Sequence, residues 1–279
     1  MILYKYMSWP LEGKNYAKEL IESDEVYLTR PTAFNDPYDV EIVPVIEGEK
    51  SEIVDKLVEE RLQIYSEENK KYFVSSIRNE VKDYSSDVLK NICNEFIQHR
   101  QKTTAVLCFT DSPSNMLMWS HYADSHKGIC LEFDTEKNRL TPNVFDKIYR
   151  VEYTNSYPKI NFISEEKSEF YRKVYSTKYS DWEYEHEYRA IYRCAEIPDE
   201  NEKTGLQIAD SMIGANTRVP ENRMKKCKIS PQTIMSVICG CKMSQKQINN
   251  LKEVIANHST QIKIKQAIKR QNDFGIDIN

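Results

Sequence analysis

The segment of residues 105–134 constrains the fold most, because two strand-like runs enclose a polar stretch there. The runs AVLCF and GICLEF are apolar, and we expect each to form a buried or half-buried strand. The stretch between them, DSPSNMLMWSHYADSHK, begins with Asp, Ser and Pro, which favour the start of a helix. Two of the five histidines and one of the three tryptophans are therefore predicted to lie between two strands.

A second segment, WEYEHEYRAIYR at residues 182–193, predicts a strand that shows acidic side chains on one face. Side chains of a strand alternate between its faces, so Glu185, Glu187 and Arg189 would share one face. Clustered carboxylates raise one another's pKa, and function is one of the few reasons to keep them close. The flanking aromatic residues favour a partly enclosed site; the alternative is a solvent-facing edge on which Arg189 neutralises the acids.

Composition sets broad limits on the class of protein. With 279 residues and 40% hydrophobic residues, the chain can bury a sizeable core. Its net charge of −4 neither indicates a nucleic-acid-binding protein nor excludes a local basic groove. Seven cysteines, most in apolar runs, indicate free thiols in a reducing compartment. With no long apolar run and no cleavage pattern, we expect a soluble, cytoplasmic protein without a membrane segment.

Hydrophobic periodicity predicts a single α+β domain over residues 1–279. Strand, helix and strand open the chain at residues 2–7, 15–23 and 26–29, and a helical insertion follows at about 50–102. The run IPDENEKTG begins a loop at about 196–226 that could act as a lid. A strand, a helix capped by Ser244 and a last strand close the chain.

Other residues that carry chemistry are scattered along the sequence. Asp111, His121 and His126, together with the two glutamates, could hold a divalent metal in a hydrolase or nuclease, although no third ligand can be placed beside the histidines. Ser120 and His121 are adjacent on a helix and point in different directions, so they would not form a nucleophile and base. No glycine-rich phosphate loop occurs, which argues against a P-loop or dinucleotide-binding enzyme.

Four segments together resemble the bacterial domain of unknown function family 2971 (DUF2971). They are LYKY, RPTAFNDPYD, CFTDSPSNMLMWSHYADSHKGICLEF and WEYEHEYR. The resemblance covers about residues 1–45 and 105–193 and leaves out the helical insertion. The family's name implies no activity.

The layout is also similar to that of the ADP-ribosyltransferase superfamily, notably the toxins that modify DNA bases. Phe109-Thr110, Ser112-Pro113 and Met116 match loosely the segment that flanks nicotinamide, and Glu187 falls where the catalytic acid would be. The resemblance implies a mixed, split ADP-ribosyltransferase-like sheet, NAD as substrate and no metal.

The same resemblance implies the site residues. Glu187 would stabilise the oxocarbenium-like transition state of NAD cleavage, and Glu185 would orient the acceptor or act as a base. The residues implied in NAD binding come from four parts of the chain: Tyr4, Lys5, Tyr6, Phe109, Thr110, Trp119, His121 and Arg189.

The resulting hypothesis is an ADP-ribosyltransferase-like enzyme that transfers ADP-ribose to a macromolecule, with nucleic acid as one candidate acceptor, or that hydrolyses NAD. Such an enzyme would serve as a toxin or anti-phage defence effector, with a neutralising or defence-system protein as partner. The metal-dependent hydrolase or nuclease and a non-catalytic module that senses a ligand or binds a partner remain as alternatives.

Overall fold

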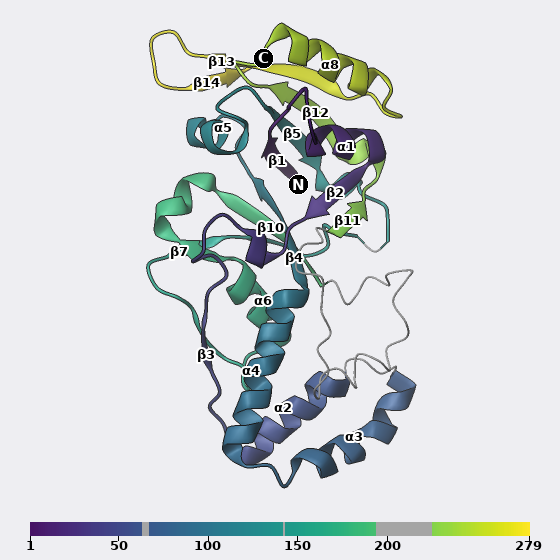
Figure 1. Ribbon diagram of the computed structural model, residues 1–279, viewed down its shortest axis with the longest axis vertical. Coiled ribbons are helices and arrows are strands. Elements are labelled where there is room, and N and C mark those ends of the chain that lie inside the picture. Colours follow the sequence, from purple (N-terminus) through teal and green to yellow (C-terminus); the bar gives the residue numbers. More distant parts are fainter. Residues whose placement is uncertain (63–66, 142, 194–224) are drawn as a thin grey trace.

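A computed structural model describes residues 1–62, 67–141, 143–193 and 225–279 of the chain, which form the α+β fold that the sequence predicts (Figure 1). All but the last two residues of the predicted lid at about 196–226 lie outside the described residues. No helix in the described ranges is long and apolar enough to cross a membrane.

An eight-stranded sheet forms the centre of the molecule. All neighbouring strands in it are antiparallel except β12 and β13, which are parallel and joined by helix α8 (Gln245–Ala256). The strand order is β14 (Ile276–Ile278), β13 (Lys263–Lys269), β12 (Ile234–Cys239), β5 (Ile129–Asp134), β1 (Ile2–Met7), β4 (Thr104–Thr110), β10 (Glu187–Arg193) and β6 (Ile148–Arg150).

The sheet divides between β1 and β4, because these two strands pair only at Tyr4 and Thr110. Farther along β4, Val106 exchanges two backbone hydrogen bonds of 2.8 Å with Thr29. Between these two points the carbonyl of Cys108 accepts a hydrogen bond of 3.1 Å from the ammonium of Lys5. The Lys5 side chain thus lies where backbone hydrogen bonds between β1 and β4 would otherwise continue, and the sheet is split at its centre.

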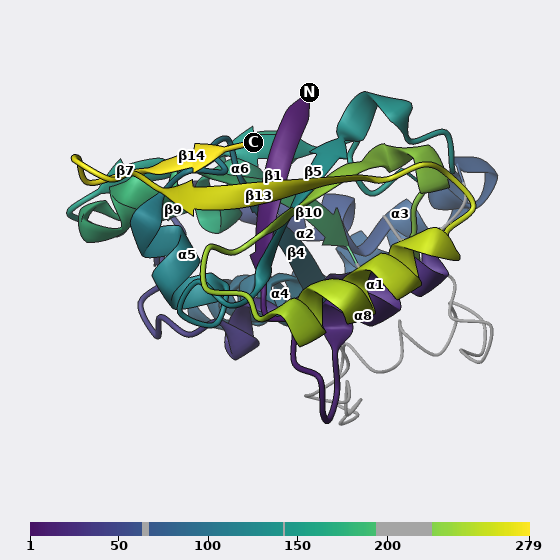
Figure 2. The same ribbon diagram turned by 90° about the horizontal axis from the view of Figure 1, so that it is seen from above.

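Helices cover both faces of the sheet. In two perpendicular views, α5 (Met116–Tyr122) lies on one side of β1, and α8 lies on the other with α1 (Tyr16–Ser23) (Figures 1 and 2). The core under α1 and α8 is continuous and includes Leu3, Leu107 and Phe133. On the opposite face the core forms two separate clusters, one under α5 and one beside the helical segment. The space between those two clusters is left for polar side chains.

The helical segment predicted at about 50–102 consists of α2 (Lys50–Leu62), α3 (Glu67–Val81) and α4 (Ser86–Thr103). Helix α6 (Lys167–Tyr175) packs with this segment. The remaining strands form three short pairs: β2 (Glu25–Leu28) with β11 (Lys225–Lys228), β3 (Val43–Val45) with β8 (Lys159–Asn161), and β7 (Glu152–Thr154) with β9 (Thr177–Tyr179).

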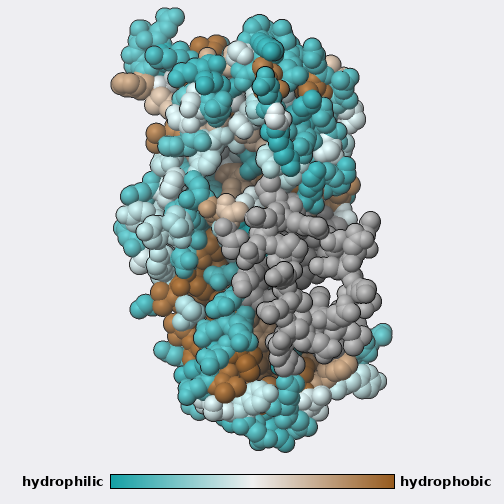
Figure 3. Space-filling view, viewed as in Figure 1, coloured by the Kyte–Doolittle hydropathy of each residue, from teal (hydrophilic) through white to brown (hydrophobic). Residues whose placement is uncertain are grey.

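The surface differs between the two halves of the molecule. On the face in Figure 3, hydrophilic side chains cover the region of α8, while hydrophobic side chains gather beside β3 and α4. Val43 of β3, for example, is 39% exposed.

One sequence prediction is wrong in its extent. The acidic strand predicted over residues 182–193 begins only at Glu187, because Ser180–Glu185 form a 3-10 helix, η3, and His186 adopts a left-handed conformation with φ of 46°. This turn buries Glu185 instead of alternating it along a strand. Glu185 and Glu187 therefore do not share a strand face.

Candidate functional site

A cavity of about 440 Å³ opens where the sheet splits. β1 lines it with Tyr4, Lys5 and Tyr6, and β4 lines it with Cys108 and Phe109. Tyr4 and Thr110 are directly opposite each other in the sheet, and Thr110 is opposite Glu187. Side chains opposite one another in a sheet project to the same face, so Tyr4 and Glu187 face the same side. That side is the one on which the hydrophobic core is divided.

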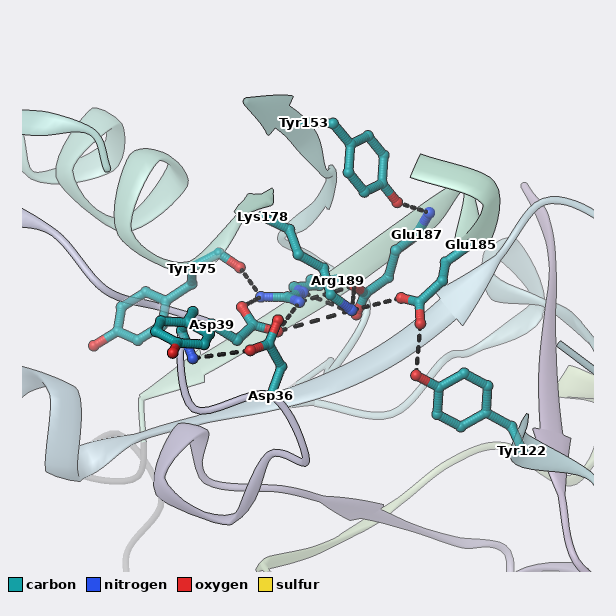
Figure 4. A network of polar contacts seen from close by, with 10 residues as sticks. Asp36, Asp39, Tyr122, Tyr153, Tyr175, Lys178, Glu185, Glu187 and Arg189 are labelled. Atoms are coloured by element: carbon teal, nitrogen blue, oxygen red, sulfur yellow. Dashed lines mark hydrogen bonds and ion pairs between the residues drawn. The ribbon is translucent and has the colours of Figure 1, made fainter. Parts of the chain in front are cut away.

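Arg189 of β10 anchors the charged wall of this cavity and is 0% exposed (Figure 4). Its Nη1 and Nη2 donate to the two carboxylate oxygens of Asp39 at 2.8 and 2.6 Å. Its Nε and Nη2 donate to the two carboxylate oxygens of Glu187, both at 2.8 Å, and Nη1 also donates to the carbonyl of Tyr175 at 3.0 Å. A guanidinium has five N–H donors, and all five are used within the protein. This geometry fixes the Glu187 carboxylate rigidly, and a phosphate contact would have to displace one of these bonds.

Lys178 of β9 joins the two glutamates. Its ammonium lies 2.5 Å from Glu185 Oε2 and 3.3 Å from Glu187 Oε2 (Figure 4). It also lies 4.8 Å from the centre of the Trp182 ring, which provides a cation–π contact. The cluster thus contains three carboxylates, counting Asp39, and two cations. With all five groups ionised it carries one net negative charge in a site that excludes much of the water.

The surroundings shift the pKa values of the two glutamates in opposite directions. Burial alone would raise the pKa of Glu187, but Arg189 and then Lys178 outweigh burial and lower it to about 2. Burial raises the pKa of Glu185, and repulsion from Glu187 adds to this, while Lys178 opposes it. Carboxyl groups whose surroundings push their pKa values apart are the usual pattern of an acid–base pair. Glu187 is therefore suited to remain an anion, and Glu185 to exchange a proton.

Two tyrosines and one lysine complete the polar contacts of the site. The Tyr122 hydroxyl, from the end of α5, donates to Glu185 Oε1 at 2.5 Å, and the Tyr153 hydroxyl accepts from the backbone N–H of Glu187 at 2.8 Å. Burial lowers the pKa of Lys5, the cation in the gap of the sheet. Each of these groups comes from a different element, so the site forms only when the whole fold is assembled.

Most residues that the sequence singled out meet at this cavity. Tyr4, Lys5, Tyr6, Phe109, His121, Glu185, Glu187 and Arg189 all line it. Thr110 is buried in the ladder between β1 and β10. Trp119 is fully buried behind the cavity wall, where its Nε1 donates to the carbonyl of Pro113 at 2.8 Å and its ring packs edge-on against Tyr6. Thr110 and Trp119 thus support the wall and do not line the cavity.

The residues of the metal hypothesis do not converge. Asp111 lies 3.5 Å from His186, and His126 Nε2 lies 3.0 Å from the hydroxyl of Ser120, while His121 lines the cavity. Across the described ranges, no three His, Cys, Asp or Glu side chains are grouped to hold a metal ion.

The pair of Ser120 and His126 lies outside the cavity, with His126 Nε2 3.0 Å from the Ser120 hydroxyl. The Nδ1 atom of His126 is buried and has no hydrogen-bond partner in the described structure. A catalytic histidine is oriented by a third group at its other ring nitrogen, and the described structure shows none here.

Sequence reasoning missed Asp39, Lys178 and Tyr122 as members of the site. Asp39 lies in the segment RPTAFNDPYD, in which Asn35 and Asp36 before Pro37 favour a turn, and this pattern does not predict a buried carboxylate. The next residue, Val40, adopts φ of 64°, which a β-branched residue rarely does. Such strained backbone is found near functional sites, yet no sequence pattern reveals it.

A comparison with curated proteins and with solved structures found no match. A family model described as "Protein of unknown function (DUF2971)" matches residues 118–190. The matched segment contains Tyr122, Lys178, Glu185, Glu187 and Arg189, and thus most of the charged cluster. Over residues 118–190 the predicted similarity of this chain to the DUF2971 family is therefore confirmed.

Proposed function

We propose that the cavity binds NAD and that the chain is an ADP-ribosyltransferase-like enzyme. Glu187 would stabilise the positive charge that develops on the ribose as nicotinamide leaves. ADP-ribose would then pass to a macromolecular acceptor or to water. The observation that carries the proposal is a buried, ionised Glu187, fixed by Arg189, in the wall of a cavity that opens at the split of the sheet.

The chemistry of NAD cleavage matches this charge arrangement. Breaking the glycosidic bond creates an oxocarbenium-like carbon, and a carboxylate that is already oriented stabilises such charge without reorganising. Glu187 has a depressed pKa and remains an anion near neutral pH. The Glu185 carboxyl has a raised pKa, which suits a group that removes a proton from the acceptor or from water.

The remaining wall suits the nicotinamide end of NAD. Tyr4, Tyr6, Phe34 and Tyr122 provide aromatic surface around the carboxylates. The volume of about 440 Å³ lies within the range of roughly 300–1,000 Å³ that is usual for small-molecule sites.

The decisive test is incubation of the purified chain with NAD labelled in its adenylate part, with and without DNA, RNA or cell lysate. Released nicotinamide and labelled macromolecule are both measured. The wild type should release nicotinamide, and Glu187→Gln should reduce the rate by about 100- to 1,000-fold, as for other preorganised electrostatic groups.

The matched control is Glu183→Gln, which makes the same chemical change on an exposed residue four positions away. It should keep the wild-type rate. No nicotinamide release by the wild type under any of these conditions, or equal rates for Glu187→Gln and Glu183→Gln, would refute the proposal.

Uncontrolled consumption of NAD or modification of macromolecules harms the cell, so such an activity would suit a toxin or anti-phage defence effector with a neutralising partner protein. Expression of the wild type should then slow growth, and Glu187→Gln should relieve the effect at equal protein level. Equal toxicity of the two proteins would contradict this role.

A further inference from the structure

A second cavity, of about 520 Å³, lies beside the first, and Lys178 lines both of them. Three tyrosines line the second cavity: Tyr38 lies between β2 and β3, Tyr157 lies between β7 and β8, and Tyr179 ends β9. Their exposed fractions are 66%, 45% and 48%. Three aromatic rings from separate segments thus border one opening and are accessible to a ligand.

The charges of this lining favour a cation over an anion. Lys178 is the one cation among the described residues that line the cavity, and its ammonium is bound to Glu185 and Glu187. Glu41 is the one carboxylate of the same lining; it is solvent-exposed and forms no ion pair with the described residues. A phosphate or carboxylate would therefore meet a negative charge and a cation that is already paired, whereas a positively charged ligand would be attracted.

Neutral polar side chains of the cavity are partly occupied within the protein. The Thr177 hydroxyl donates to the carbonyl of Lys173 at 2.7 Å, and the Asn155 Oδ1 accepts from the hydroxyl of Ser180. These bonds use the one donor of Thr177 and the side-chain acceptor of Asn155. A ligand rich in hydroxyl groups, such as a sugar, therefore finds fewer partners here than the residue types suggest. The accessible rings are the main contact surface.

A quaternary ammonium group matches rings and a carboxylate of this kind. The face of an aromatic ring is negative and attracts a cation placed over it. A primary ammonium also carries three N–H donors, which need acceptors when they leave water. A quaternary ammonium has no such donor, so its methyl groups can contact the rings directly. The cavity volume lies within the range of roughly 300–1,000 Å³ of small-molecule sites, which favours a free small molecule as the ligand.

We propose that the second cavity binds the quaternary ammonium group of a small molecule, in contact with Tyr38, Tyr157 and Tyr179 and attracted by Glu41. Lys178 stands between this ligand and the two buried glutamates, so the second site is a neighbour of the first cavity and not a part of it. The proposal does not rest on the proposed function, because it requires neither NAD nor the acid pair.

The test compares choline with the uncharged alcohol in which a carbon atom replaces the nitrogen of choline. The two molecules have the same shape, so the difference in affinity reports the charge alone. Binding to the full chain is measured by titration with ligand-observed NMR, which suits weak binding, in the absence of NAD. Choline should bind to the wild type, and the uncharged alcohol should bind at least about tenfold more weakly.

Tyr38→Ala and Tyr179→Ala should each weaken choline binding by about 2- to 30-fold, which corresponds to about 0.5–2 kcal/mol for one cation–π contact. Tyr38→Phe keeps the ring and should bind within about twofold of the wild type. The matched control is Tyr72→Ala on α3, since Tyr72 is 69% exposed and lies outside both cavities. It should bind choline like the wild type.

Glu41→Gln removes the charge of the second cavity and keeps the shape of the side chain. The affinity for choline should fall by about 1.5- to 5-fold, as for other exposed charges. Salt screens such an attraction, so the difference between Glu41→Gln and the wild type should shrink at high salt.

Several outcomes would overturn the proposal. Equal affinities for choline and the uncharged alcohol would show that the cavity selects apolar surface and not charge. Equal choline affinities of the wild type, Tyr38→Ala and Tyr179→Ala would place the ligand elsewhere. Failure of the wild type to bind choline, with binding of a peptide that contains trimethyllysine, would assign the cavity to a protein; failure to bind either would leave no cation site.

The two proposals of this article fail separately. Choline binding that depends on Tyr38, without release of nicotinamide, would establish the cation site and refute the proposed enzyme. Release of nicotinamide that depends on Glu187, without choline binding, would support the enzyme and refute the cation site.

Discussion

Replacement of Asp39 by asparagine should test whether the buried clamp around Arg189 stabilises the fold. The side chains of Asp39 and Arg189 are 3% and 1% exposed and share two hydrogen bonds of 2.8 and 2.6 Å. Asparagine has the same shape as aspartate, so Asp39→Asn creates no cavity. It removes the charge and turns one acceptor into a donor that faces an N–H group of Arg189.

Removing one partner of a buried ion pair costs about 3–5 kcal/mol, because the remaining charge keeps its desolvation penalty. Glu187 still neutralises Arg189 in the variant, which places the expected loss near the lower end of that range. With a urea dependence of about 3 kcal/mol per M, the unfolding midpoint would fall by about 1 M. Tryptophan fluorescence and circular dichroism during urea unfolding would measure this shift.

The matched control is Glu152→Gln. Glu152 is 68% exposed and lies 3.4 Å from Arg172, so the ion pair between them should contribute at most about 1 kcal/mol to the free energy of unfolding. In a double-mutant cycle, Asp39→Asn and Arg189→Met should be non-additive, because both remove the same contact. A loss for Asp39→Asn no larger than that of the control, or additivity within about 0.5 kcal/mol, would refute the reasoning.

Two further predictions concern acid stability and close packing. The pKa of Glu187 is about 2 in the folded protein against 4.5 ordinarily, so its contribution is fully present above pH 4.5 and disappears as the pH falls through about 2. The loss of unfolding free energy is on the order of 3 kcal/mol. Glu187→Gln should flatten the dependence of the urea midpoint on pH in that window. An unchanged dependence would contradict the depressed pKa of Glu187. Gly240→Ala should destabilise the fold by about 1–3 kcal/mol in thermal unfolding, because a Cβ there would lie 2.1 Å from the backbone oxygen of His126; a wild-type melting temperature would show that this contact relaxes freely.

Features with a local cause could be predicted from the sequence. The first strand has the predicted bounds, residues 2–7, because alternation and a following turn define it. Helix α8 begins after Ser244, whose side chain forms a capping box with Gln247. The three helices of residues 50–103 follow from their apolar spacing. In each case the signal lies within a few residues of the structure that it predicts.

The charged cluster could be predicted only in part, because contacts distant in sequence create it. Glu185 and Glu187 drew attention as neighbours, but a 3-10 turn and Lys178 bring them together, not strand alternation. Asp39 contacts Arg189 across 150 residues of sequence, and no periodicity carries that information. Burial also changes the role that the sequence suggests for Arg189. Its positive charge suggests contact with a ligand, but its side chain is buried and binds the Glu187 carboxylate instead.

The position of β1 has a consequence for the order of folding during synthesis. This strand leaves the ribosome well before its partners Thr110 and Phe133, which emerge more than one hundred residues later. Helices α2, α3 and α4 contact one another locally and can form in the meantime. Glu187 and Arg189 emerge later still, so the nascent chain has no complete charged cluster until residue 189 has been made. Strand β1 must therefore stay unpaired until β4 and β5 have been made, at residues 110 and 134, and this interval is when the chain is most exposed to mispairing and aggregation.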